Sequence, residues 1–150
     1  MTKLIYTALT IAAIMSISMA VILANQVNAQ QQIGYIAILN GKNEVPSHTD
    51  VTATGMAGFI VNNAKTKIWY QLEAEGLKKV TQAHIHSGKS GENGPIVATL
   101  FKGNKDSVSG ALVQGSVTAD KLEGPLKGKS ISDLVSLIEK SSAYVNMLIC

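Results

Sequence analysis

The feature that most constrains the fold is an alternation of side-chain type, which recurs in short runs along the chain. In residues 52–61 every second residue is small or apolar, and in residues 67–75 the apolar residues again take alternate positions. A period of two places these side chains on one face of an extended strand. With 46% hydrophobic and 15% charged residues, the chain is also too apolar for a disordered tail. The runs therefore predict half-buried β-strands.

Further runs of this kind follow at a spacing of roughly 10–15 residues, with turn residues between them. We expect Gly76 to end one of these strands, because glycine weakens a strand interior. Regular short strands separated by turns are typical of an antiparallel sandwich or barrel, and 150 residues allow one such domain. The predicted fold is an all-β, antiparallel Greek-key sandwich or barrel. The expected strands are residues 33–39, 52–61, 67–75, 80–86, 95–101, 109–118 and 143–149.

One segment near the C-terminus changes to a helical period. Ser130 and Asp133 form a capping box, in which the hydroxyl accepts an N-terminal amide while the carboxylate reaches back. The apolar residues that follow have the spacing of a helix with one buried face. We expect one short helix that ends near Ser141, with its buried face made by Ile131, Leu134, Val135 and Ile138.

The N-terminal segment is predicted to direct export. Lys3 precedes an uncharged apolar stretch at residues 4–24, and small residues at Val27 and Ala29 then suit a cleavage site. The stretch is longer than the usual apolar region of a signal peptide and could nearly span a bilayer, so a retained anchor is the alternative. Residues 1–29 are therefore a signal peptide or a membrane anchor, and residues 30–150 form the domain. We expect a secreted or cell-surface protein.

Charge and cysteine content exclude several classes of function. The formal net charge is +3, and all 13 basic residues are lysines. Without arginine, the chain lacks the side chain that most favours nucleic-acid and bidentate phosphate recognition, so no nucleic-acid partner is expected. Cys150 is the single cysteine, which excludes an intramolecular disulfide but allows a link between two chains. The chain has no nucleophile elbow and no plausible Cys–His pair, so an enzyme is not expected.

The most informative tripeptide is His84-Ile85-His86. On a strand, residues two apart project from the same face, which brings two imidazoles together as ligands of one copper or zinc ion. A zinc site needs three or four protein ligands, and the candidates for the remainder are Glu44, His48 and Glu92. The alternative interpretation is structural: both histidines bind loop backbone and hold the turn that runs to Pro95.

Several motifs in the chain resemble those of the chordin-type, or CHRD, domain family. The most specific lies in residues 82–97 and is similar to the family's Ala-His-Ile-His and Gly-x-Asn-Gly-Pro-Val-Val signature. The likeness covers residues 33–147. The matching pieces are Leu39-Asn40-Gly41-Lys42-Asn43-Glu44-Val45-Pro46, Thr54-Gly55-Met56-Ala57, Ile68-Trp69-Tyr70-Gln71-Leu72, Gln82-Ala83-His84-Ile85-His86, Gly91-Glu92-Asn93-Gly94-Pro95-Ile96-Val97 and Ala143-Tyr144-Val145-Asn146-Met147.

The resemblance implies an extracellular sandwich, immunoglobulin-like or superoxide-dismutase-like, whose partner is an extracellular or cell-surface protein. It also implies that the motif residues have a binding or structural role. The His-x-His strand is similar to the copper-ligand strand of copper–zinc superoxide dismutase, but this chain offers no full ligand set for such an enzyme. The motif residues singled out on this basis are Asn43, Glu44, Pro46, Asn93, Gly94, Pro95 and Asn146.

The chain departs from the family pattern after Met147. Leu148 stands where the family has a third histidine, and the family's closing strand is missing. We therefore expect an exposed sheet edge and self-association, either through that edge or through Cys150. The predicted function is a non-catalytic extracellular binding or structural module. The alternative is a copper- or zinc-binding extracellular protein that uses the His-x-His strand.

Overall fold

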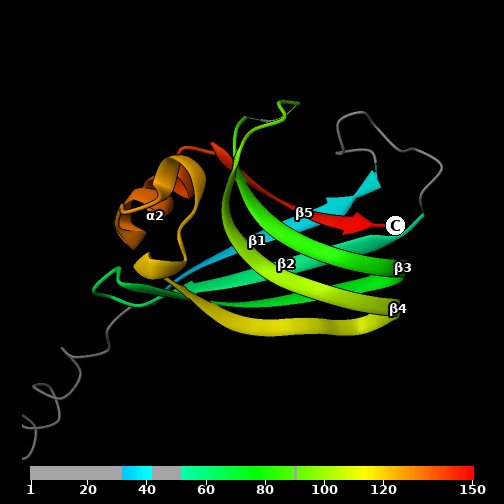
Figure 1. The fold of residues 1–150 in the computed structure, drawn as a ribbon. Coiled ribbons are helices and arrows are strands. Elements are labelled where there is room, and N and C mark those ends of the chain that lie inside the picture. The colour runs from blue at the N-terminus through cyan, green and yellow to red at the C-terminus, as the bar shows by residue number, and fades with distance from the viewer. Residues whose placement is uncertain (1–31, 42–51, 90) are drawn as a thin grey trace, which may run out of the picture. The chain divides into compact units, whose positions relative to one another are not determined.

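Five antiparallel strands and a short helix make up most of the described chain (Figure 1). The computed structural model describes residues 32–41, 52–89 and 91–150, which belong to the unit Gln32–Cys150. The predicted all-β class with one helix near the C-terminus is confirmed. In chain order the elements are β1 (Ile33–Asn40), β2 (Thr54–Val61), β3 (Lys67–Ser87), β4 (Ile96–Thr118), the 3-10 turns η2 (Ala119–Lys121) and η3 (Gly124–Leu126), α2 (Ile131–Glu139) and β5 (Ala143–Ile149).

The sheet order is β1-β2-β3-β4, with β5 pairing β3 as well. Two strands are longer than expected. Gly76 does not end a strand: it lies inside β3, which continues to Ser87, and the prediction of two separate strands there was wrong. The expected strands 95–101 and 109–118 are likewise joined in β4. Positive φ angles of 72° at Gly76 and 98° at Gly110 fall beside shifts of the β3–β4 register, so the glycines bend the hairpin rather than break it.

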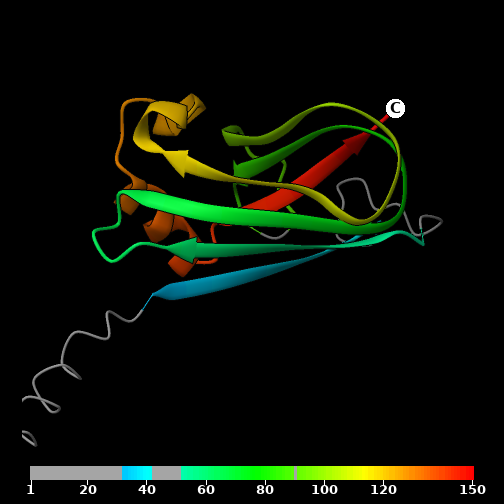
Figure 2. The ribbon, with the colours of Figure 1, turned by 90° about the horizontal axis from the view of Figure 1, so that it is seen from below.

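The bend divides the sheet into two layers. The first half of β3 pairs with β2, from Val61 opposite Ile68 to Thr54 opposite Glu75. The second half of β3 pairs with β5, from Val80 opposite Ile149 to Ser87 opposite Ala143. Figure 2 shows the hairpin curling back so that β5 lies across from β1 and β2. The inward side chains of both layers form one buried cluster, which includes Phe59, Ile68, Leu72, Ala83 and Ile85.

Helix α2 contacts β3, β4 and β5, and lies at one end of the strands (Figure 1). The predicted capping box is confirmed: Ser130 Oγ accepts from the backbone N–H of Asp133, and Asp133 accepts from the backbone N–H of Ser130 at 2.8 Å. The buried face of the helix consists of Ile131, Leu134 and Val135. In residues 32–41, 52–89 and 91–150, no helix has the length and apolar character needed to cross a bilayer. The predicted export segment, residues 4–24, lies outside these residues.

A substitution at Ile85 tests whether the second layer contributes to the buried core. Its side chain is 2% exposed, whereas that of Ile60 on β2 is 45% exposed. We expect Ile85→Ala to lower the free energy of unfolding by about 2–5 kcal/mol, because the substitution leaves a cavity. Ile60→Ala should change it by less than about 0.5 kcal/mol. Chemical denaturation followed by circular dichroism measures both values, and equal losses would contradict the layer assignment.

Candidate functional site

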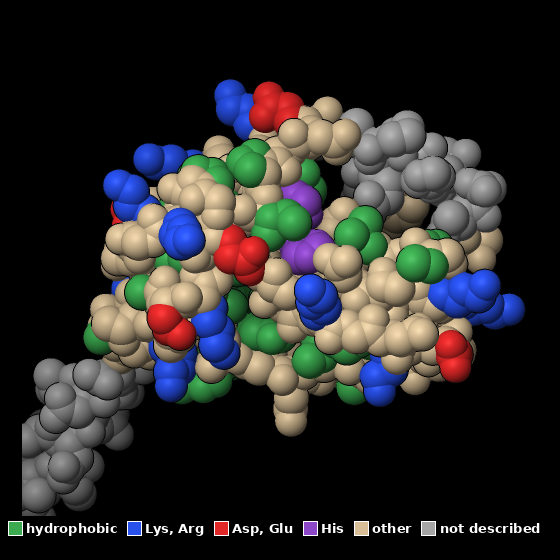
Figure 3. Space-filling view, viewed as in Figure 1, with side chains coloured by type: hydrophobic (Ala, Val, Ile, Leu, Met, Phe, Trp, Pro, Cys, Tyr) green, Lys and Arg blue, Asp and Glu red, His purple; other side chains and the backbone are tan. Residues whose placement is uncertain are grey.

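His84 and His86 lie side by side on the second half of β3, between β4 and β5. His84 is opposite Thr99 on β4 and Asn146 on β5, and His86 is opposite Tyr144 on β5. The two imidazole centroids are 5.7 Å apart and their planes meet at 83°. Figure 3 shows both rings on one face of the molecule, next to hydrophobic side chains and an acidic one. Ile85 between them is buried in the core, as strand periodicity requires.

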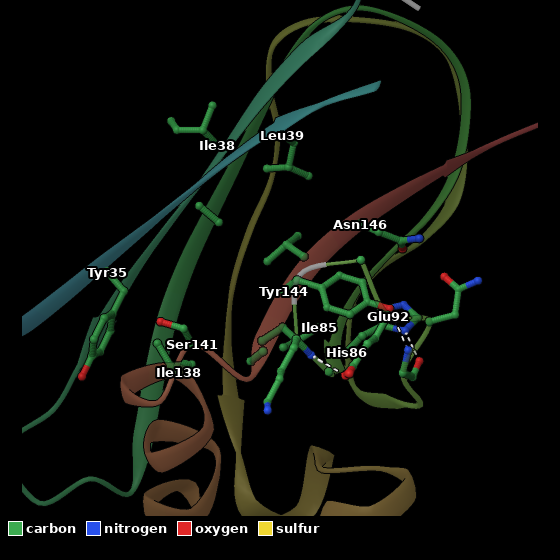
Figure 4. A pocket seen from close by; sticks show the side chains of 18 of the residues that line it. Tyr35, Ile38, Leu39, Ile85, His86, Glu92, Ile138, Ser141, Tyr144 and Asn146 are labelled. Atoms are coloured by element: carbon green, nitrogen blue, oxygen red, sulfur yellow. Dashed lines mark hydrogen bonds between the residues drawn. The ribbon is translucent and has the colours of Figure 1, made fainter. Parts of the chain in front are cut away.

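His86 holds the loop that follows β3. Its Nδ1 lies 2.8 Å from the carbonyl oxygen of Gly94, and because a carbonyl only accepts, Nδ1 carries the proton. The lone pair is therefore on Nε2, which is buried and has no hydrogen-bond partner. Tyr144 stacks on the ring, with centroids 5.0 Å apart and an interplanar angle of 11° (Figure 4). The hydrogen bond and the stack together fix both the tautomer and the orientation of His86.

The same loop is held at further points. The backbone N–H of Gly94 donates to the Tyr144 hydroxyl at 3.0 Å, and that of Ser87 donates to the Pro95 carbonyl at 3.0 Å. A Cβ at Gly94 would overlap the Ser87 carbonyl, so this position needs glycine. Glu92 accepts a hydrogen bond from the backbone N–H of Lys89 at 2.9 Å, while Gly91, Glu92 and Asn93 are exposed. The loop is thus anchored at its base and open to solvent at its tip.

His84 is 3% exposed and is the one polar side chain classed as buried in the described part of the chain. Burial is the main cause that lowers its pKa, and the neighbouring imidazole of His86 adds to the effect. The Glu123 carboxylate and the Asn146 side chain act in the opposite direction. Glu123 is itself placed by the backbone N–H of Thr99, which donates to its Oε1 at 3.1 Å. The result is an imidazole held in its neutral form.

Three buried polar atoms at this site make no hydrogen bond of normal geometry: His84 Nδ1, His86 Nε2 and Asn146 Oδ1. The Asn146 side chain nevertheless lies near enough to His84 to act on its pKa. Buried polar atoms are paired in the great majority of cases, because an unpaired one costs about 1–3 kcal/mol. Three such atoms lie on facing positions of β3 and β5, and together they lower the free energy of unfolding of the domain. This cluster is the strongest indication of a ligand-binding site in the described residues.

A groove of about 760 Å³ lies beside this cluster, between β1 and β5. Figure 4 shows Tyr35, Ile38 and Leu39 of β1 on one side and Tyr144 and Asn146 of β5 on the other. The groove is also lined by His86, by Ile138 of α2, and by loop residues 88–89 and 91–94. Its walls therefore combine apolar and polar surface in nearly equal shares, with the imidazole and the loop at one side.

The structure brings together only some of the residues singled out from the sequence. His84, His86 and Asn146 meet where β3 pairs with β5. Gly94 and Pro95 instead accept the hydrogen bonds that anchor the loop to β3. Among the described residues, no group of three or more His, Cys, Asp or Glu side chains is placed to hold a metal ion. Outside the described residues lie Asn43, Glu44, Pro46 and His48.

Tyr144 and Glu123 belong to the site but were missed from the sequence. Tyr144 precedes Asn146 by two residues on β5, so the strand period carried a usable signal for it. Glu123 follows η2 and reaches Thr99 through tertiary folding, for which the sequence holds no local signal.

A family model described as the CHRD domain matches residues 35–148. No curated protein and no solved structure matches the chain significantly.

The lowered pKa of His84 predicts a pH dependence of stability in metal-free protein. Because the folded state binds the proton less readily than the unfolded state, the contribution of His84 is fully present above the unfolded pKa of about 6.5. It is lost as pH falls from there through the lower, folded pKa. Urea unfolding between pH 5 and 8 measures this slope, which we expect to be shallower in His84→Gln. An unchanged slope in that variant would contradict the assignment.

Proposed function

The chain belongs to the CHRD domain family, an extracellular-type module, and we propose that it acts as an exported, non-catalytic binding or structural module. The family match covers nearly all the described residues. Export is supported by the apolar residues 4–24 and the small residues at Val27 and Ala29. Cleavage after Ala29 is the favoured outcome, and a retained membrane anchor is the alternative.

One observation carries this proposal: the family's most specific motif builds an anchored surface loop. His86 and Tyr144 both bind Gly94, at 2.8 and 3.0 Å, so two side chains from neighbouring strands fix one glycine. The tip at Gly91, Glu92 and Asn93 stays exposed. A loop fixed at its base loses little conformational entropy on binding, which favours recognition of a partner surface. The partner is an extracellular or cell-surface protein.

Site-specific photo-crosslinking tests the binding role. With a photoreactive residue in place of Glu92, we expect the exported full chain to form a discrete crosslink to an extracellular protein. Asp106 provides the control position, because it is also exposed and lies ten positions along β4 from Ile96, near the midpoint of that strand. Electrophoresis and mass spectrometry identify the products.

The proposed binding role predicts a product from position 92 and none from position 106. The same product from both positions, or none from either, would count against recognition by the loop. Recovery of the chain only inside the cell would count against export.

A second candidate function is metal binding by His84 and His86. The specific observation is the fixed tautomer of His86, whose donated Nδ1 proton leaves a buried Nε2 lone pair, as in many metal-ligating histidines. At about 2.0–2.1 Å per metal–nitrogen bond, two imidazoles on one ion have centroids roughly 4.5–6 Å apart, which includes the observed 5.7 Å. Asn146 Oδ1 is a third buried atom without a regular hydrogen bond, and its lone pair would supply an oxygen ligand. Imidazole nitrogens suit copper and zinc.

The metal hypothesis predicts close to one copper or zinc ion per chain after incubation with the metal and exhaustive dialysis. The double variant His84→Ala/His86→Ala should lose that metal, and Asn146→Ala should retain less of it. Added metal should raise the melting temperature of the wild type but not that of the double histidine variant, by linkage. Elemental analysis and calorimetry measure the two effects.

Tyr144→Phe is the matched control for the metal experiment. It removes the hydroxyl that binds Gly94 but keeps both imidazoles, so it loosens the loop without removing a proposed ligand. Metal retained by Tyr144→Phe and lost by the double histidine variant supports a metal site. Substoichiometric metal in all variants, with no change in melting, contradicts it and leaves the structural role of the histidines.

A further inference from the structure

Trp69 is exposed on the outer face of the first layer, the face that points away from the core. It is the single tryptophan of the chain and is 43% exposed, whereas Ile68 and Tyr70 on either side of it pack on the core. Lys67 lies two residues earlier on the same face, with its Nζ 5.8 Å from the centroid of the indole ring. This cation–π contact limits the motion of the ring. The indole therefore offers a flat, oriented surface to solvent.

Strand pairing gathers polar side chains beside this ring. Ser116 on β4 is opposite Trp69, and Gln114 is opposite Gln71, which follows Trp69 on the same face of β3. Gln71 Nε2 donates a hydrogen bond to Glu73 Oε1 at 2.7 Å, which orients the amide and leaves its Oε1 as an acceptor. Two amides and a hydroxyl thus form a polar side of the surface.

The other side of the surface is apolar, and a glycine lowers the floor between the two sides. Ile60 on β2 is opposite Trp69, and Ile36 on β1 is opposite Gly58; the two isoleucines are 45% and 72% exposed. Gly58 lies between Ile36 and Gln71 in the register, and a Cβ there would have no atom beyond its chain neighbours within 4 Å. The resulting groove, of about 770 Å³, is open to solvent.

We propose that this groove binds a neutral glycan, with one pyranose ring stacked on Trp69 and its hydroxyl groups bound by Gln71 and Gln114. A pyranose ring has an apolar face of C–H groups and a rim of hydroxyl groups that both donate and accept. The groove presents the matching pair of surfaces, an aromatic face and oriented amides, side by side. Lys67 and Glu73 flank the site along β3 with opposite charges, which favours a neutral sugar over a polyanion.

Other occupants fit the polar side of the groove less well. A lipid bilayer or an apolar face of a second copy could cover Trp69 and Ile60, but it would bury the amides of Gln71 and Gln114 without hydrogen-bond partners, which lowers affinity. A glycan pairs the same amides. The groove belongs to the first layer, whereas the two histidines and their loop belong to the second half of β3. The inference therefore does not depend on the proposed binding role of that loop.

Fluorescence titration of the exported protein with cellohexaose and with chitohexaose tests the proposal. Both probes are neutral β-1,4-linked chains whose flat faces suit an open groove on a sheet. Because Trp69 is the single tryptophan, its emission reports on this groove directly. We expect at least one hexaose to give a saturable shift to shorter wavelength and protection from acrylamide quenching, because stacking removes water from the ring. Heparin, a polyanionic sugar chain, should give neither.

Calorimetry with the tighter-binding hexaose measures the variants. Trp69→Ala should weaken binding roughly tenfold or more, and Gln114→Ala by about 2–10-fold through one lost hydrogen bond. Gly58→Leu should block the groove, and its side chain has open space to occupy, so circular dichroism should show a wild-type melting curve. Ile38→Ala is the matched control, because Ile38 is 64% exposed on the outer face of β1 but does not line the groove.

Several outcomes overturn the proposal. Absence of a saturable change with both hexaoses does so, as does equal weakening of binding in Ile38→Ala and in the folded variants Gly58→Leu and Gln114→Ala. An emission shift that follows phosphatidylcholine vesicles but neither hexaose would indicate a membrane surface instead. A shift that follows protein concentration alone would indicate a second copy of the chain.

Discussion

The long hairpin of β3 and β4 bends midway along both strands, where Gly76 and Gly110 adopt positive φ angles that side chains rarely allow. Because of this bend, one strand serves two layers: its first half pairs with β2 and its second half with β5. The core forms between the halves, and His84 and His86 come to lie beside β5. A straight hairpin would give a single open sheet with one face exposed.

His86 connects the two functions that we consider. Its Nδ1 proton fixes Gly94 and so the loop, while the same bond commits the ring to the tautomer with a lone pair on Nε2. A structural role and a ligand role therefore use opposite sides of one imidazole and do not exclude each other. His84 adds a neutral, buried ring beside it, and Tyr144 holds the arrangement from β5. The three residues act as one unit because each limits the rotation of the next.

Local patterns predicted the elements well, since they depend on neighbouring residues. The alternation in β2 and the capping box at Ser130 are confirmed at nearly the expected residues. Gly76 was misjudged, because a glycine at a bend and a glycine at a strand end look alike in sequence. Strand period placed His84 and His86 together, but the unpaired nitrogens and the approach of Glu123 depend on tertiary packing. No local pattern encodes those.

The pairing of β5 with β3 has a consequence for how the molecule folds. His84 and Asn146 are neighbours in the sheet but lie far apart along the chain, with β4 and α2 between them. Contacts of high sequence separation form late, since the chain must first close a large loop. The β2–β3 and β3–β4 hairpins can therefore form before β5 pairs with the second edge of β3. During that interval the unpaired edge of β3 is open to aggregation unless a chaperone shields it. The rate at which β5 docks therefore sets the yield of native protein.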